Sequence, residues 1–97
     1  MEQEKIITLD LTGCKYLGEI HQRIKKAFDF PDFYGENWDA FWDLLRTECD
    51  ADKIVVGGGD SVPKELDASV QTMMGILEEF RELCDKDGAP VEIDIRS

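Results

Sequence analysis

The sequence predicts an α/β fold in which a small parallel sheet packs against helices. Three segments have the alternating or β-branched pattern of strands, and segments with helical periodicity separate them in the order β-α-α-β-α-β. Parallel strands need long crossover connections, which helices supply. The chain has 97 residues, of which 42% are hydrophobic. This is enough for one packed core and too little for two, so we expect a single domain over residues 1–97.

The first strand and the first helix are predicted from two different periodicities. Apolar residues alternate between residues 5 and 11, which indicates a strand. From Leu17 to Phe28 they recur every three or four positions, which is the spacing of one helix face. We expect Pro31 to close this helix, because the residue before a proline is pushed out of the α region.

A second helix is expected from Asn37, a favourable N-cap residue, to about Glu48. Its core-facing residues are predicted to be Trp38, Phe41 and Leu45, with Leu44 and Trp42 at the margins. Residues 53–56 are short, apolar and β-branched, which indicates a second strand ended by the glycines that follow.

The longest periodic pattern lies beyond Pro63 and predicts a third helix. Its apolar residues follow steps of three and four: Leu66, Val70, Met73, Leu77, Phe80 and Cys84. Gly75 lies inside this pattern and costs the helix roughly 1 kcal/mol. Gly88 is a plausible stop signal, and the alternation of residues 91–95 predicts the last strand.

The charge of the chain is strongly negative and unevenly distributed. There are 22 acidic and 11 basic residues, which give a net charge of -11. Such a chain repels nucleic acids and anionic membranes and attracts basic proteins. Residues 29–52 contain eight acids and one base, Arg46. Because a solvated face normally mixes both signs, this block favours a surface for a positively charged partner, although solubility alone would explain the total charge.

The cysteines and the N-terminus point to the cytoplasm. The three cysteines, Cys14, Cys49 and Cys84, are widely spaced and contain no Cys-x-x-Cys pair. A disulfide framework or a zinc site is therefore not expected, and reduced thiols are. The N-terminus has no apolar signal-peptide core, and no apolar run is long enough to span a bilayer. We expect a cytoplasmic protein with no cofactor.

Two carboxylates on the second predicted helix are the strongest candidates for a functional role. Asp39 and Asp43 are four residues apart and share a face, where like charges cost a helix roughly 0.2–0.5 kcal/mol. Such a pair could serve general acid–base catalysis, bind a divalent metal, or present oxygens to Arg and Lys of a partner protein. A purely solvated face is the remaining alternative.

Aromatic residues around these acids favour the partner-binding alternative. Phe33 and Tyr34 precede the helix and Trp42 lies between the two acids, and aromatic anchors beside charge are typical of binding hot spots. Gly35 is expected to supply a positive φ at the tightest point of the loop. The lone histidine, His21, has no Cys or Ser nucleophile near it, which is not a catalytic signature. It is expected to pack at the edge of the core.

A second acidic group lies on the third predicted helix. It comprises Glu78, Glu79, Glu82 and Asp85. Glu82 and Lys86 have the spacing of a favourable i,i+4 pair, so this group alone is best explained as solvated surface. It gains significance only if the fold brings it beside Asp39 and Asp43.

Residues 31–45 closely resemble the barstar family, the intracellular protein inhibitors of barnase-type ribonucleases. They are Pro-Asp-Phe-Tyr-Gly-Glu-Asn-Trp-Asp-Ala-Phe-Trp-Asp-Leu-Leu, and the family motif is Pro-x-Tyr-Tyr-Gly-x-Asn-x-Asp-Ala-x-Trp-Asp. Ile20-His21-Gln22 and Phe80-Arg81-Glu82 also fit, and the order of elements agrees along nearly the whole chain. Phe33 replaces the first tyrosine of the motif, and Glu48 stands where the family's namesake has a tryptophan on its binding surface.

The resemblance implies both an architecture and an activity. The architecture is a two-layer fold, with a three-stranded parallel sheet packed against three to four helices. The activity is inhibition of a basic extracellular ribonuclease in a one-to-one complex, by a protein that is not an enzyme and is monomeric when free. A different basic nuclease toxin, against which the chain would act as an immunity protein, is one alternative partner. A regulatory module that docks another basic protein is a second.

The resemblance also implies roles for individual residues. Asp43 would enter the phosphate-binding pocket of the nuclease as a mimic of RNA phosphate, and Asp39 would pair with a basic residue. Phe33 would stack over a catalytic histidine. The remaining implied roles are support of the binding helix by Trp42, a salt bridge from Glu82, and shaping of the loop by Gly35, Glu36 and Asn37.

Overall fold

The computed structural model describes residues 4–96 and has the predicted order of elements. The strands and helices are β1 (Ile6–Asp10), α1 (Leu17–Phe28), α2 (Trp38–Glu48), β2 (Lys53–Gly57), α3 (Asp67–Lys86) and β3 (Glu92–Ile95). Two short 3-10 helices, Gly59–Ser61 and Lys64–Leu66, connect β2 to α3 and were not predicted. The α/β class is confirmed.

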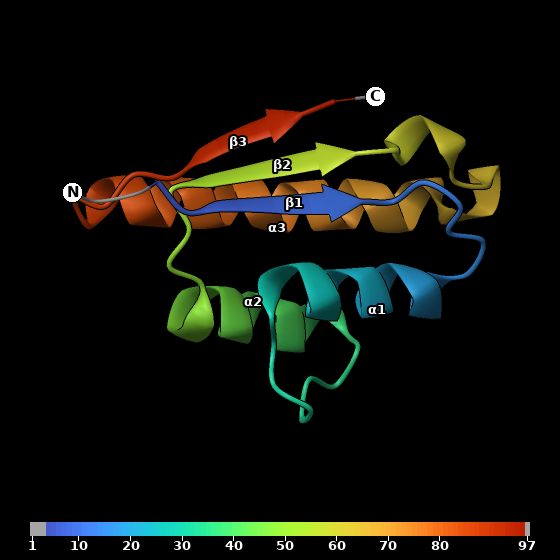
Figure 1. Cartoon of the computed structure of the whole chain (residues 1–97), viewed down its shortest axis with the longest axis horizontal. Helices are drawn as coiled ribbons and strands as arrows, with labels where there is room; N and C mark the ends of the chain where they lie inside the picture. Colours follow the sequence, from blue (N-terminus) through green and yellow to red (C-terminus); the bar gives the residue numbers. More distant parts are fainter. Residues whose placement is uncertain (1–3, 97) are drawn as a thin grey trace.

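The three strands form one parallel sheet in the order β1-β2-β3 (Figure 1). Residues of the inner face are in register across the sheet, with Ile7 opposite Ile54 and Ile54 opposite Ile93. Burial alternates along β1 and β2, so one face is covered and the other is open to solvent. Figure 1 shows α3 running behind the strands. In the same view, α1 and α2 lie below the sheet and nearer to the viewer than α3. The two-layer architecture is therefore confirmed.

The core joins all three helices to the covered face of the sheet. Its largest fully buried side chains are Phe41, Leu9, Leu11, Ile20, Ile24, Leu45, Ile54, Met73 and Leu77. Phe41 and Leu45 come from α2, as predicted. Leu44 is buried as well, so it belongs to the core and not to its margin, and Trp38 is only half-buried. α2 is thus anchored by one face and presents the other to solvent.

α1 ends with a Schellman motif and is not closed by the proline. Asp29 takes a left-handed conformation with φ 56°. Its N–H donates to the carbonyl of Lys26 at 3.4 Å, and the N–H of Phe30 donates to the carbonyl of Lys25 at 3.0 Å. The helix has therefore already ended before Pro31. Sequence reasoning missed this stop because glycine, and not aspartate, is the usual left-handed residue there.

Two further findings concern the cysteines and the membrane. All three cysteines are free thiols, with Cys14 buried and Cys49 and Cys84 half-buried. Burial raises the pKa of each thiol, which favours its neutral, packed form.

Within residues 4–96, no helix is long and apolar enough to cross a membrane.

Candidate functional site

The outward face of α2 presents the two predicted carboxylates. Asp39 and Asp43 are exposed, one helical turn apart, while Phe41 and Leu45 on the inward face are fully buried. The side chain of Asp43 retains 66% of its accessible surface. The burial of the apolar face therefore fixes the direction in which these charges point.

Arg46 lies against both Asp43 and Trp42. Its Nη2 donates to Oδ1 of Asp43 at 2.8 Å, and its guanidinium carbon lies 5.4 Å from the centre of the Trp42 ring. A cation at this distance from an indole face is attracted to the ring. Trp42 is half-buried, so its ring packs against the core on one side and contacts Arg46 at the surface on the other. Arg46 is the one base of the acidic block, and it forms an ion pair with Asp43 that leaves both side chains substantially exposed.

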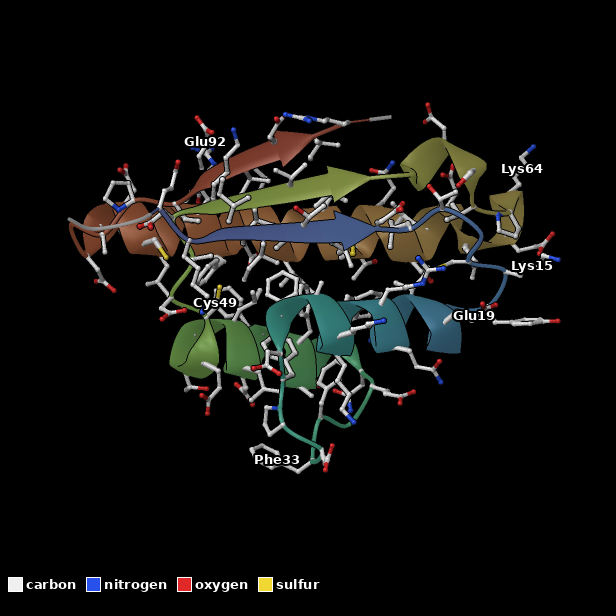
Figure 2. The ribbon with its side chains drawn as sticks, in the orientation of Figure 1. Lys15, Glu19, Phe33, Cys49, Lys64 and Glu92 are labelled. Atoms are coloured by element: carbon white, nitrogen blue, oxygen red, sulfur yellow. The ribbon has the colours of Figure 1, made fainter. Side chains whose placement is uncertain are left out.

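The loop before α2 separates two neighbouring aromatic residues. Phe33 is 76% exposed, and Figure 2 shows it at the tip of the loop, on the side of the molecule away from the sheet. Tyr34 is only 5% exposed. The expectation that both rings belong to the accessible surface is therefore right for Phe33 and wrong for Tyr34.

The hydroxyl of Tyr34 forms a buried hydrogen bond with the lone histidine, His21. The hydroxyl oxygen lies 2.6 Å from Nδ1 of His21, and the His21 ring centre lies 4.4 Å from that of Trp38. His21 is 2% exposed, so it lies within the core and not at its edge. Burial lowers the pKa of His21, although the negative charge of Glu36 acts to raise it. Burial also raises the pKa of Tyr34. A neutral histidine and a neutral phenol therefore join α1 to the loop.

The loop makes its sharp turn at Glu36 and not at Gly35. Glu36 has φ 52°, while Gly35 is outside the left-handed region, so the prediction for Gly35 is wrong. A Cβ at Gly35 would lie 3.0 Å from Nδ2 of Asn37, so a larger residue would require the Asn37 side chain to shift. That amide donates to the Gly35 carbonyl at 3.2 Å.

Asn37 is the N-cap of α2, as predicted. Its Oδ1 accepts a hydrogen bond from the N–H of Ala40 at 2.8 Å. The same side chain therefore caps the helix and ties it to the preceding loop. A cap of this kind is worth roughly 1 kcal/mol relative to alanine. The left-handed backbone at Glu36 is thus spanned by the hydrogen bond from Asn37 to Gly35 and followed by the Asn37 cap.

The acidic group on α3 has a different ion pair from the predicted one. Among the described side chains, Arg81 pairs with Glu78, with Nη2 2.8 Å from Oε2, and no pair joins Glu82 to Lys86. Glu82 is exposed on a helix that packs against α2. Its participation in the same surface as Asp39 and Asp43 stays a prediction.

A metal centre was one alternative for the paired carboxylates. Across residues 4–96, no group of three or more His, Cys, Asp or Glu side chains is arranged to hold a metal ion. The assembled features are instead two exposed carboxylates, one exposed phenylalanine and one half-buried tryptophan on a loop and helix held by internal hydrogen bonds. This arrangement can bind a basic surface.

Comparison with known proteins supports this interpretation. Residues 4–96 match the family model described as Barstar (barnase inhibitor). A 39-residue stretch, 40% of this chain, is 54% identical to the Bacillus subtilis (strain 168) protein named "Putative ribonuclease inhibitor YrdF". The matched stretch spans 43% of that relative, which is less than half its length.

Proposed function

Because the chain belongs to the barstar family, we propose that it inhibits a basic, barnase-type ribonuclease by covering its active site. The observation that carries this proposal is the exposed pair Asp39 and Asp43 on a helix whose opposite face is fixed in the core. An inhibitor of this kind needs no catalytic residue. It needs negative oxygens held where the enzyme binds the phosphates of RNA.

In the proposed complex, Asp43 occupies the phosphate-binding pocket of the nuclease and Asp39 pairs with a neighbouring basic residue. Both make charge-assisted hydrogen bonds, which are shorter and stronger than neutral ones. Phe33 stacks on a ring in the active site, for which its 76% exposure leaves it free. Trp42 supports the helix, and Glu82 adds an ion pair from α3.

The loop supports binding by being ordered before the partner arrives. The Tyr34–His21 contact, the Asn37 cap and the Asn37–Gly35 hydrogen bond all exist in the free chain. Less conformational entropy is then lost on association, which strengthens binding without adding a contact. The acidic block also steers a basic enzyme toward this face. Electrostatic steering is known for the complex that gives this family its name, and we expect it here by analogy with that complex.

The proposed setting is the cytoplasm of a cell that makes a secreted nuclease, with one inhibitor bound per enzyme. Titration of a barnase-type ribonuclease with the purified chain, followed by RNA cleavage, tests this directly. We expect activity to fall linearly and to end at one equivalent. Full activity at excess inhibitor would show that the enzyme is not its partner.

A charge-matched pair of variants makes the titration specific for the proposed surface. Asp39→Asn with Asp43→Asn removes two charges from α2. Asp60→Asn with Glu65→Gln removes two exposed charges from the segment between β2 and α3. Only the first pair is expected to lose inhibition. Equal losses would mean that net charge alone causes the effect.

A different basic nuclease toxin is the second candidate partner, and Glu48 favours it. Glu48 is exposed in the last turn of α2. By the resemblance, the family's namesake has a tryptophan of its binding surface at this position. An acid there suits an enzyme with an additional base at the rim. A panel of basic nucleases assayed at the same inhibitor concentration distinguishes the candidates, and Glu48→Trp should move the preference toward barnase-type enzymes.

A further inference from the structure

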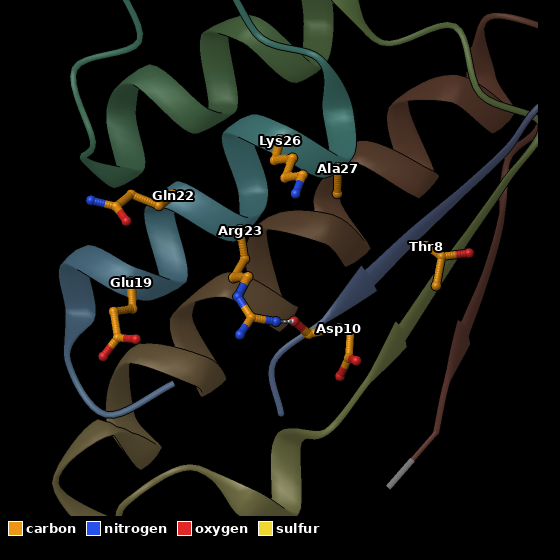
Figure 3. A pocket seen from close by; sticks show the side chains of 7 residues that line it. All are labelled: Thr8, Asp10, Glu19, Gln22, Arg23, Lys26 and Ala27. Atoms are coloured by element: carbon orange, nitrogen blue, oxygen red, sulfur yellow. Dashed lines mark hydrogen bonds between the residues drawn. The ribbon is translucent and has the colours of Figure 1, made fainter. Parts of the chain in front are cut away.

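Two hollows on the surface differ in the chemistry of their side chains. The first, of about 650 Å³, lies between α1 and the edge of β1 (Figure 3). It combines two acids, Asp10 and Glu19, with two bases, Arg23 and Lys26, so its charges select no particular ligand. The second, of about 480 Å³, is lined by two of the three cysteines. Two thiols can bond covalently to each other, so the second hollow is a candidate site of modification.

The second hollow lies where two connections enter neighbouring strands. Cys49 directly follows α2 and precedes β2, and Cys84 lies in the last turn of α3, before β3. The N–H of Glu92 donates to the carbonyl of Asp52 at 3.0 Å, which ties the two connections together at the start of the sheet. Figure 2 shows the side chain of Cys49 pointing from the end of α2 toward the sheet and α3. The fold thus brings two cysteines that are distant in sequence to the same hollow.

The two thiols of this hollow are near each other and partly accessible. Cys49 and Cys84 are half-buried and pack against the core. Burial raises the pKa of both thiols. Cys84 also acts to raise the pKa of Cys49, so the two sulfur atoms lie close enough for the charge of one to act on the other. At neutral pH both are therefore protonated thiols that share one partly open space.

Cys14 shows what a purely packed cysteine looks like in the same chain. It is 1% exposed and belongs to the core. Burial raises its pKa, and the charges that also act on this thiol belong to Arg23, Glu19 and Asp10. Packing as a small apolar residue accounts for Cys14. It does not account for two further cysteines that line one open hollow.

We propose that Cys49 and Cys84 form a reversible disulfide when the chain meets hydrogen peroxide, and that this bond clamps the end of α2 to the end of α3. Both cysteines lie at the ends of helices, where the backbone adjusts more readily than in a helix interior. α2 already packs against α3, so the bond joins two elements that are in contact before oxidation.

The oxidation proceeds in two steps. The thiolate of one cysteine attacks an oxygen of the peroxide; a sulfur–oxygen bond forms, the oxygen–oxygen bond breaks, and the leaving hydroxide takes up the thiol proton as water. The thiolate of the other cysteine then attacks the sulfenic sulfur. A sulfur–sulfur bond forms, the sulfur–oxygen bond breaks, and hydroxide leaves as water with the second thiol proton. The two sulfur atoms give up two electrons, which the peroxide accepts. Dithiothreitol reverses the bond by thiol–disulfide exchange and is itself oxidised to a disulfide.

The bond has a predictable effect on stability. It closes the chain segment from Cys49 to Cys84, which contains β2 and most of α3. A cross-link of this kind lowers the conformational entropy of the unfolded chain, so the folded state is favoured. Neither the bond nor its effect requires a nuclease, so both can be measured on the chain alone.

Peptide mapping by mass spectrometry tests the bond. The reduced chain is treated with hydrogen peroxide, its remaining thiols are alkylated, and the protein is digested. We expect a cross-linked pair of peptides that joins Cys49 to Cys84, is released by dithiothreitol, and leaves Cys14 alkylated. Cys14→Ala should form the same bond, whereas Cys49→Ser should not. Alkylation of both Cys49 and Cys84 after peroxide treatment overturns the proposal, and so does a bond between two copies of the chain.

Thermal unfolding tests the clamp. The oxidised chain should unfold at least about 5 °C above the reduced chain. Peroxide treatment of Cys49→Ser should not raise its unfolding temperature, and this control also accounts for any oxidation of methionine. If the wild-type chain carries the bond and its unfolding temperature does not rise, the clamp between α2 and α3 is overturned.

Discussion

Oδ1 of Asp43 accepts a hydrogen bond from Nη2 of Arg46 at 2.8 Å, so the central acid of the proposed binding surface is already paired within its own helix. Arg46 is also held over the ring of Trp42. Both partners of the pair are substantially exposed, with 43% and 66% of their side-chain surface accessible. The pair is therefore weak enough for a competing cation to replace Arg46.

Arg46→Ala is expected to strengthen binding to a basic nuclease by about 2- to 5-fold. The variant removes a positive charge that a basic enzyme must approach, and an exposed ion pair is worth only about 0.2–1 kcal/mol. Inhibition constants and association rates at low and high salt measure the effect. Arg96→Ala, which breaks a pair of similar length with Asp94 outside the loop and α2, is the control. Weaker binding after Arg46→Ala would mean that Arg46 itself contacts the enzyme.

Asp43→Ala is expected to weaken binding by about 2–5 kcal/mol, which is the cost of breaking a buried charge pair in an interface. That range was established in part on the complex that gives this family its name. The enzyme's cations would be left buried without a partner. The free energy of unfolding should change by less than about 1 kcal/mol, because Asp43 is exposed. Calorimetric titration and urea unfolding measure the two quantities. A loss of stability with unchanged affinity would make Asp43 a structural residue.

Periodicity and capping chemistry were sufficient to predict the α/β class and the order of the elements, whereas the two-layer, three-stranded architecture was expected from the family resemblance. The apolar stripe of α3, the Asn37 cap and the alternation of β1 each reflect a local physical rule, and each is found in the structure. The two 3-10 helices before α3 were missed, because such short turns carry no periodic signal. The end of α1 was assigned to Pro31, because a left-handed Asp29 leaves no mark in the sequence.

The site was less predictable than the fold, since its details depend on contacts between distant residues. The exposure of Asp39 and Asp43 follows from helical spacing alone. The burial of Tyr34 does not, because it depends on His21, thirteen residues earlier. An aromatic residue next to a glycine in a loop can point either way. Only the fold decides that Tyr34 turns inward while Phe33 remains exposed.

Glu36→Gly and Glu36→Ala together measure the strain in the loop. Glu36 has φ 52°, which is unfavourable for a residue with a Cβ and free for glycine. Both variants remove the carboxylate, and only the glycine relieves the backbone. We expect Glu36→Gly to be more stable than Glu36→Ala by about 1 kcal/mol in urea unfolding. Equal stabilities would show that the loop relaxes to another conformation when the side chain is removed.

Gly35→Ala is expected to lower stability by up to about 1 kcal/mol, the value of the α2 cap. The added Cβ would lie 3.0 Å from Nδ2 of Asn37, so that side chain must shift and its bond to Ala40 weakens. Thermal unfolding measures the loss. Gly59→Ala is a control, because a Cβ there meets no atom within 4 Å. Asn37→Ala removes the cap, so adding Gly35→Ala to that variant should lower its stability little further. If the double variant instead loses as much additional stability as Gly35→Ala alone, the loss does not act through the cap.

Lowering the pH from 7.5 to 5 is expected to destabilise the chain through its single histidine. Burial lowers the pKa of His21 in the folded state below its ordinary value near 6.5. As the pH falls through 6.5, the unfolded chain binds a proton that the folded chain resists, so stability is full above this pH and is lost below it. One such group changes the free energy of unfolding by at most about 1.4 kcal/mol per pH unit. Urea unfolding at several pH values measures the loss. His21→Gln has no titratable proton at this position, so the stability of this variant should be nearly independent of pH over the same range. An equal loss in this variant would assign the pH dependence to other groups.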